Sequence, residues 1–225
     1  MKRIGLGILA LFVAVPLYGQ GLTITMKETG PIGETAPTIQ TDRTHARLDA
    51  PSLATQVLYD SSTKTLRLVV PLLRSYREYT PATIQNAPAI GVRGQPGQAQ
   101  VPITYKRTGS GKVKNWTCTT YEGFRGSDKV AEVCAAEGTA IGLTSADFTI
   151  VQQAIDLVRT ITAPELIERI PTYGSVASQG FAGFPVRRVS FRNGQPELTT
   201  ELVEIRRDAV PAENFAVPTG FTKAP

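Results

Sequence analysis

The chain has 225 residues, of which 24 are basic and 19 acidic, giving a net charge of +5 with a single histidine. The charges are interspersed rather than gathered into a basic stretch, so the composition does not favour nucleic-acid binding. One histidine and two cysteines are too few for a structural zinc site with four ligands, and the sequence predicts neither a metal nor a cofactor.

Residues 1–20 have the three parts of a secretory signal peptide. Lys2 and Arg3 precede an apolar run over 4–15, and small residues ending at Gly19 follow it. The run is shorter than the roughly 20 apolar residues that span a bilayer, although a signal anchor is the competing interpretation. The sequence therefore predicts a periplasmic or secreted protein. The rest, 21–225, is one domain, with a net charge of +3 once Lys2 and Arg3 are subtracted.

Strand patterns dominate the first third of this domain. Residues 22–27 alternate apolar and polar side chains, as a half-buried strand does. Residues 28–37 hold two Gly and two Pro and predict a loop, whereas the polar stretch 38–49 predicts an edge strand that faces solvent. The same criteria predict further strands at 55–59, 65–70 and 74–79.

Residues 81–100 differ in composition, with three Pro and three Gly among polar residues. Such a segment offers little to a core and predicts a flexible surface loop. It is interpreted as an insertion without function, with a lid or partner-binding loop as the alternative. The sheet is expected to resume at 101–106. The RTGSGK segment at 107–112 predicts a hairpin turn, because it lacks the first glycine and the Ser or Thr of a phosphate-binding loop.

Residues 114–138 contain both cysteines. Two strand-forming runs flank a turn at Gly126, and Cys118 and Cys134 lie equally far from it along the chain. In an exported protein two cysteines predict one disulfide, and a hairpin centred on Gly126 places them directly opposite each other. A bridge that closes such a loop contributes about 3 kcal/mol. Each face of this hairpin carries apolar groups, so the pattern does not tell which face is buried.

The residues from Ser145 to Ile161 carry apolar side chains at spacings of three and four, which predicts an amphipathic helix capped by Thr144 or Ser145. A shorter helix is expected over 162–170. Two interpretations of the first helix remain open: its apolar stripe fills the core, or it leaves a cavity for a lipid-like ligand. In the second interpretation the ligand-binding residues are Phe148, Val151, Ile155 and Val158.

The chain then returns to strands. Residues 171–183 predict a loop, and 186–192 and 197–206 flank Asn193-Gly194, the strongest hairpin signal in the sequence. The apolar residues of the tail at 211–221 are expected to dock on the sheet. Many strands interrupted by one helical segment predict an α+β fold, in which a mostly antiparallel sheet, an incomplete β-barrel, carries one or two helices on one side.

No catalytic residue is predicted. His45 has Asp42 and Asp49 as its only local carboxylates and no nucleophile beside it, so a solvated surface histidine is preferred to a general base. The chain is therefore interpreted as a binding or structural protein and not as an enzyme.

Several short motifs follow one another in a fixed order: Tyr59-Asp60 with Lys64-Thr65, CTTYEGFRGSDKVAEV at 118–133, GLTSADF at 142–148, GFPVR at 183–187, Asn193-Gly194 and FAVPTG at 215–220. With these motifs the chain resembles a family of exported bacterial proteins of unknown function, over roughly residues 55–222. That family is similar to the periplasmic lipoprotein-carrier superfamily, whose fold is a curved, incomplete antiparallel β-barrel with helices on its open side. The loop at 81–100 looks inserted relative to this pattern, and Cys134 stands where an aromatic residue is more usual.

The resemblance implies a location in the cell envelope and binding of acyl chains, a lipoprotein or an envelope protein; it transfers no catalytic residue. The leading hypothesis is a periplasmic carrier-like module that holds a lipid or acyl chain between a curved sheet and its helices. The alternative is a structural or protein-interaction domain with a filled core and no ligand.

Overall fold

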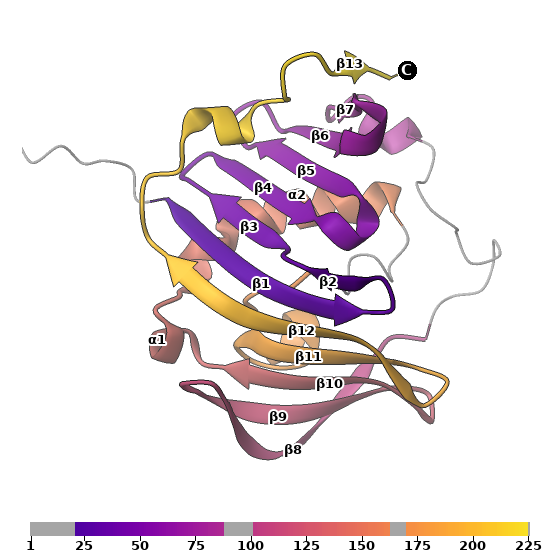
Figure 1. Ribbon diagram of the computed structural model, residues 1–225, viewed down its shortest axis with the longest axis vertical. Helices are drawn as coiled ribbons and strands as arrows, with labels where there is room; N and C mark the ends of the chain where they lie inside the picture. Colours follow the sequence, from indigo (N-terminus) through magenta and orange to yellow (C-terminus); the bar gives the residue numbers. More distant parts are fainter. Residues whose placement is uncertain (1–20, 88–100, 163–169, 225) are drawn as a thin grey trace, which may run out of the picture.

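The computed structural model describes residues 21–87, 101–162 and 170–224 (Figure 1). The predicted signal peptide, most of the predicted loop at 81–100 and most of the second predicted helix lie outside these ranges. Within them, no helix is long and apolar enough to cross a membrane.

In the described part of the chain, thirteen strands form one open, mostly antiparallel sheet that curves in front of the helices (Figure 1). The predicted α+β class is confirmed. The strands lie in the order β13-β7-β6-β5-β4-β3-β1-β12-β11-β10-β9-β8, with β2 also paired to β1. Their bounds are β1 (Leu22–Gly30), β2 (Gly33–Thr35), β3 (Thr38–Thr41), β4 (His45–Ala50), β5 (Thr55–Asp60), β6 (Thr65–Val70), β7 (Ser75–Tyr79), β8 (Thr104–Val113), β9 (Trp116–Arg125), β10 (Asp128–Ala136), β11 (Phe184–Arg192), β12 (Gln195–Arg206) and β13 (Thr222–Lys223).

In the described residues the helices are fewer than the strands, and only α2 has more than four residues. The bounds of the α-helices are α1 (Gly138–Ile141), α2 (Thr149–Ile161) and α4 (Val176–Gln179), and those of the 3-10 turns are η1 (Pro51–Leu53), η2 (Pro71–Leu73), η3 (Ile84–Asn86), η4 (Ser145–Phe148) and η5 (Ala212–Phe215). From the predicted loop at 81–100 the structure describes 81–87, where Ile84 of η3 is buried in the core. The tail docks as expected, because Phe215 is buried and β13 pairs with β7.

Two expectations for the first strands are wrong. The predicted loop at 28–37 contains the end of β1 and all of β2, which meet in a tight turn where Gly33 has φ +102°. The predicted edge strand at 38–49 is two strands, β3 and β4, in the interior of the sheet. Their buried side chains, among them Ile39 and Leu48, are separated by polar residues on the opposite face, so the stretch has a polar composition although every second residue of its strands faces the core.

The hairpin turn predicted at 107–112 is also wrong, because β8 runs through this segment to Val113 and the turn follows at Lys114, with φ +50°. The register of β8 against β9 shifts between Arg107 and Gly109. Since β8 is the last strand of the sheet, this irregularity and the local glycines disturb only one ladder.

The disulfide between Cys118 and Cys134 is confirmed, with a Cα–Cα distance of 5.4 Å, but the two residues are not direct partners. Cys134 lies opposite Thr120, because the two-residue turn at Gly126-Ser127 and a register shift between Lys129 and Ala131 each move β10 by one residue along β9. The bridge is therefore diagonal. Both faces of the hairpin are buried: the cysteines join the main core, and Val133 joins a smaller cluster around Phe181.

Helix α2 packs against β4 and β5, behind the sheet as drawn in Figure 1. A capping box precedes it, in which Asp147 accepts hydrogen bonds from the backbone N–H and the hydroxyl of Thr144 at 2.6 and 2.9 Å. Burial raises the pKa of Asp147, but the ion pair with Arg207 and these bonds outweigh it and leave the pKa below its usual value. The C-terminal end of β12 is thereby linked to the start of the helix.

Candidate functional site

The central strands place a row of polar side chains on the helix-bearing face of the sheet. Glu28 of β1 lies opposite Thr200 of β12, which in turn lies opposite Arg188 of β11. Glu28 and Thr200 are 5% and 7% exposed, and the adjacent Met26 is 1% exposed. In β3, β4 and β6 the helix-bearing face carries apolar side chains such as Ile39, Leu48 and Leu68. Polar groups therefore enter the interior of the protein at the row of Glu28, Thr200 and Arg188.

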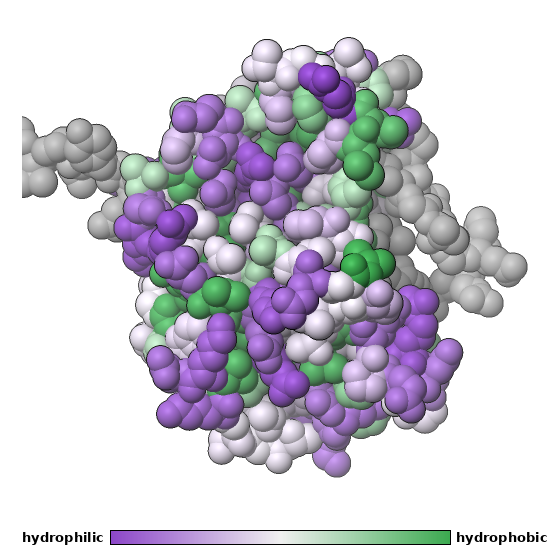
Figure 2. All heavy atoms as spheres, viewed as in Figure 1, coloured by the Kyte–Doolittle hydropathy of each residue, from purple (hydrophilic) through white to green (hydrophobic). Residues whose placement is uncertain are grey.

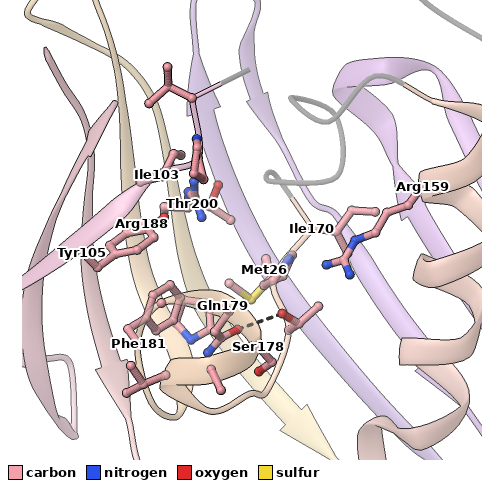
Figure 3. Close-up of a pocket in the computed structure, with 18 residues that line it drawn as sticks. Met26, Ile103, Tyr105, Arg159, Ile170, Ser178, Gln179, Phe181, Arg188 and Thr200 are labelled. Atoms are coloured by element: carbon pink, nitrogen blue, oxygen red, sulfur yellow. Dashed lines mark hydrogen bonds between the residues drawn. The ribbon is translucent and has the colours of Figure 1, made fainter. Parts of the chain in front are cut away.

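A cavity of about 760 Å³ opens in front of this row (Figure 3). Its walls are the central strands, the segment around α4 and the C-terminal end of α2, from which Arg159 reaches the rim. Figure 3 shows Arg188 beside Thr200 on the strand side, and Gln179 and Phe181 on the α4 side. The volume lies within the range of roughly 300–1,000 Å³ that is typical of ligand sites.

A second cavity of about 270 Å³ continues from the first under β3 to β6. The two share four lining residues: Met26, Ile170, Pro171 and Thr200. Apolar side chains make up most of the smaller cavity's wall, in particular Ile39, Leu48, Leu53, Val57, Leu68 and Val158. Together the two spaces form one compartment of mixed polarity and one mostly apolar compartment, which meet at Met26 and Thr200.

The segment around α4 closes the larger cavity through hydrogen bonds and aromatic contacts. Gln179 accepts a bond from the Thr172 hydroxyl at 2.9 Å and donates one to the carbonyl of Gly183 at 2.7 Å. Phe181 is buried and contacts the edge of the Tyr105 ring, with ring centroids 5.0 Å apart. This wall is therefore tied to β8 and to the start of β11.

The predicted ligand-binding residues lie in different surroundings. Val151 and Ile155 are fully buried and line neither cavity. Val158 lines the smaller cavity. Phe148 packs on Phe184 and lines a third hollow, of about 540 Å³, beside the polar face of α2.

Sequence reasoning missed the polar row and most of the apolar wall. One signal for Glu28 was available, because the alternation of Leu22, Ile24 and Met26 continues to position 28 if the strand is not ended at Lys27. The position of Arg188 depends on register shifts in β11 and β10, which no local pattern reveals.

Charge is unevenly distributed along the row. The carboxylate of Glu28 accepts a bond from the Thr35 hydroxyl at 3.4 Å. The Nε atom of Arg188 is buried, and within the described residues it has no hydrogen-bond partner. Arg159 at the rim is paired with Asp156 at 3.1 Å.

His45 lies away from these cavities and stacks on Phe215, with ring centroids 5.3 Å apart. Burial raises the pKa of Asp42, but hydrogen bonds from Thr44 and His45 outweigh it and leave the pKa below its usual value. The Asp42 carboxylate and the Thr44 hydroxyl both approach Nδ1 of His45, each at 3.0 Å. A nucleophile–base pair needs its carboxylate and its nucleophile on opposite ring nitrogens, so this cluster is not a triad.

In the described ranges, His, Cys, Asp and Glu side chains form no group of three or more that could hold a metal ion. The front of the sheet, opposite α2, has hydrophilic side chains with small apolar patches between them (Figure 2). The cavities behind the sheet are therefore the candidate functional site.

Three solved structures that match the chain differ in how similar they are to it. It matches an uncharacterized conserved protein from Thermus thermophilus with a TM-score of 0.50 at 8% identity, covering 92% of this chain and 90% of that one. A LolA superfamily protein from Nitrosomonas europaea matches with a TM-score of 0.29 at 7% identity, covering 89% and 91%. PNGF-II matches with a TM-score of 0.41 at 12% identity; the match covers 91% of this chain but 31% of PNGF-II.

The Thermus protein shares the fold, whereas the similarity to the LolA superfamily protein is too low to support an argument. No curated protein sequence matches the chain. The family described as "Domain of unknown function (DUF4412)" matches residues 23–221. Because this match spans most of the chain, the protein belongs to the DUF4412 family.

Proposed function

We propose that the protein is a carrier-like binding module that holds the apolar chain of a lipid between its curved sheet and its helices. The observation that carries this proposal is the apolar cavity of about 270 Å³ that continues from the larger, more polar one. Its wall is built of aliphatic side chains from several strands of the sheet and from α2. Such a wall offers a methylene chain van der Waals contact and removes it from water, which contributes about 0.8 kcal/mol per buried CH₂.

Export of the protein is part of the proposal. The signal-peptide pattern of residues 1–20 and the disulfide between Cys118 and Cys134 both support an oxidising compartment, the periplasm or the exterior of the cell. An exported binding module would meet lipids and lipid-modified proteins of the envelope there.

The alternative function, an interaction module with a filled core, is supported by a different observation. Val151 and Ile155 are fully buried, so α2 packs tightly on the sheet at these positions. This alternative predicts that the cavities hold water rather than lipid.

Two measurements separate these functions. Native mass spectrometry of protein purified from cells should reveal a bound lipid. Fluorescence titration of delipidated protein with dansyl-labelled undecanoic acid should show saturable binding. Lipid-free protein without affinity for the probe would exclude the carrier function.

A variant that fills the smaller cavity tests whether the probe binds there. Ala50 lines this cavity, so Ala50→Phe should weaken probe binding by about tenfold or more, because the ring occupies space that the chain needs. Val203→Phe is the matched control, since Val203 is 42% exposed and lines neither cavity. Equal affinity of the two variants, with unchanged thermal unfolding, would place the probe elsewhere.

A further inference from the structure

Arg188 is placed differently from the other arginines of its hairpin. It lies in the middle of β11, between Val133 of β10 and Thr200 of β12, and it lines the larger cavity (Figure 3). Its neighbour Arg187, on the opposite face, pairs with Glu201 at 3.2 Å, and Arg192 pairs with Glu197 at 2.7 Å.

The side chain of Arg188 makes no hydrogen bond and no ion pair within the described residues, and its Nε atom is buried. A buried donor that is left unpaired costs free energy, because it has lost its hydrogen bonds to water. A guanidinium also presents its N–H groups as a planar fork, which matches the two oxygens of a carboxylate or a phosphate.

The nearest carboxylate along the same row does not fill this role. Glu28 lies beyond Thr200, two strand spacings from Arg188, or about 10 Å between backbones. It accepts a bond from Thr35 and lines the smaller cavity instead of the larger one. Thr200, which lies between them, offers a hydroxyl and no charge.

We infer that the larger cavity receives the anionic headgroup of an amphiphile, a carboxylate or phosphate, with Arg188 as its binding partner and the alkyl chain in the smaller cavity. This inference rests on the proposed function. Thr200 and Met26 line both cavities, so a chain that begins at Arg188 passes them and continues toward Val158. The ligand class is therefore a single-chain anionic lipid, and an uncharged lipid of equal length is a poorer ligand.

The test compares three probes that each contain twelve carbons: dodecanoate, dodecyl phosphate and dodecanol, at a pH where both acids are ionised. Isothermal titration of delipidated protein should give affinities for the two anions about tenfold or more above that for dodecanol, as expected for charge-assisted hydrogen bonds. Arg188→Gln should reduce this preference to less than about twofold. Arg188→Lys should retain part of it, because the charge remains while the planar fork is lost.

Arg187→Gln is the matched control, because it removes the same charge one residue away on the opposite face and should leave the preference for anions unchanged. Circular dichroism and thermal unfolding report whether each variant folds.

The outcomes separate this inference from the proposed function. Equal affinities for dodecanol and dodecanoate in the unmodified protein, or an unchanged preference in folded Arg188→Gln, would overturn the headgroup assignment and leave the carrier function standing. Absence of binding for all three probes would overturn both. Stabilisation by inorganic phosphate without binding of any dodecyl compound would replace the amphiphile with a small-anion site.

Discussion

The two halves of the helix-bearing face differ in how they are covered. Over β3 to β6 lies α2, a helix of 13 residues that is about 20 Å long and buries five side chains. Over β10 to β12 lies α4, a helix of four residues, about 6 Å long, with no buried side chain. The first half is filled at its centre, whereas the second leaves the larger cavity. The larger opening therefore lies beside the short helix, and a smaller apolar cavity remains under β3 to β6.

The largest expected effect tests the filled half. Ile155 is fully buried, so Ile155→Ala should lower the free energy of unfolding by about 4 kcal/mol, from lost burial and the space left behind. Leu53 lines the smaller cavity and is partly exposed, so Leu53→Ala should cost about 1 kcal/mol. Urea unfolding followed by circular dichroism measures both. Similar losses for the two variants would show that the region under α2 is packed as tightly at the smaller cavity as at its centre.

The disulfide tests whether the half with the short helix depends on a covalent link. Cys118 and Cys134 are 16 residues apart, so replacing both with alanine should lower the free energy of unfolding by about 3 kcal/mol in the chain-entropy account. Urea unfolding with and without dithiothreitol provides the comparison. Reductant should destabilise the unmodified protein by a similar amount and leave the double variant unchanged. A double variant as stable as the unmodified protein would contradict the role of the bridge.

Local signals predicted the elements that make each half, but not the space between them. The Asn193-Gly194 turn and the helix that begins after Thr144 are each encoded within a few residues, and both were found from the sequence. The cavities are not local, because Met26, Arg188 and Thr200 meet only through the pairing of β1, β12 and β11. The same limit applies to the disulfide, whose partners were evident and whose diagonal register depends on a bulge.

A backbone contact tests how firmly the α4 segment is seated. Gly183 has φ +97°, and a Cβ atom there would collide with the carbonyl oxygen of Ala136. Gly183→Ala should therefore lower the free energy of unfolding by about 2 to 3 kcal/mol. Gly194 has φ +74° but open space around it, so Gly194→Ala isolates the backbone strain and should cost about 1 kcal/mol. Equal losses in urea unfolding would show that β10 and the α4 segment move apart at little cost.

The smallest effect concerns a turn at the edge of the filled half. The hydrogen bond from the Ser62 hydroxyl has the largest effect on the pKa of Asp60, and burial, the next largest, opposes it. Further bonds from the Thr63 hydroxyl and from both backbone amides bring the pKa down to about 2. Since the folded-state pKa lies below the unfolded value of 3.8, this carboxylate stabilises the fold above about pH 4 and loses that contribution as the pH falls toward 2. Asp60→Asn should accordingly lower the thermal unfolding temperature near neutral pH, where the carboxylate contributes fully, and flatten the fall in that temperature between about pH 4 and pH 2. Asp208→Asn is the control, because Asp208 lies outside this turn and its contact with Arg206 is long, at 3.9 Å. An equally steep fall of the unfolding temperature in Asp60→Asn would show that the turn does not contribute to the pH dependence of stability. The ion pair of Asp147 with Arg207 at the start of α2, which is more buried, would then be the next carboxylate to test.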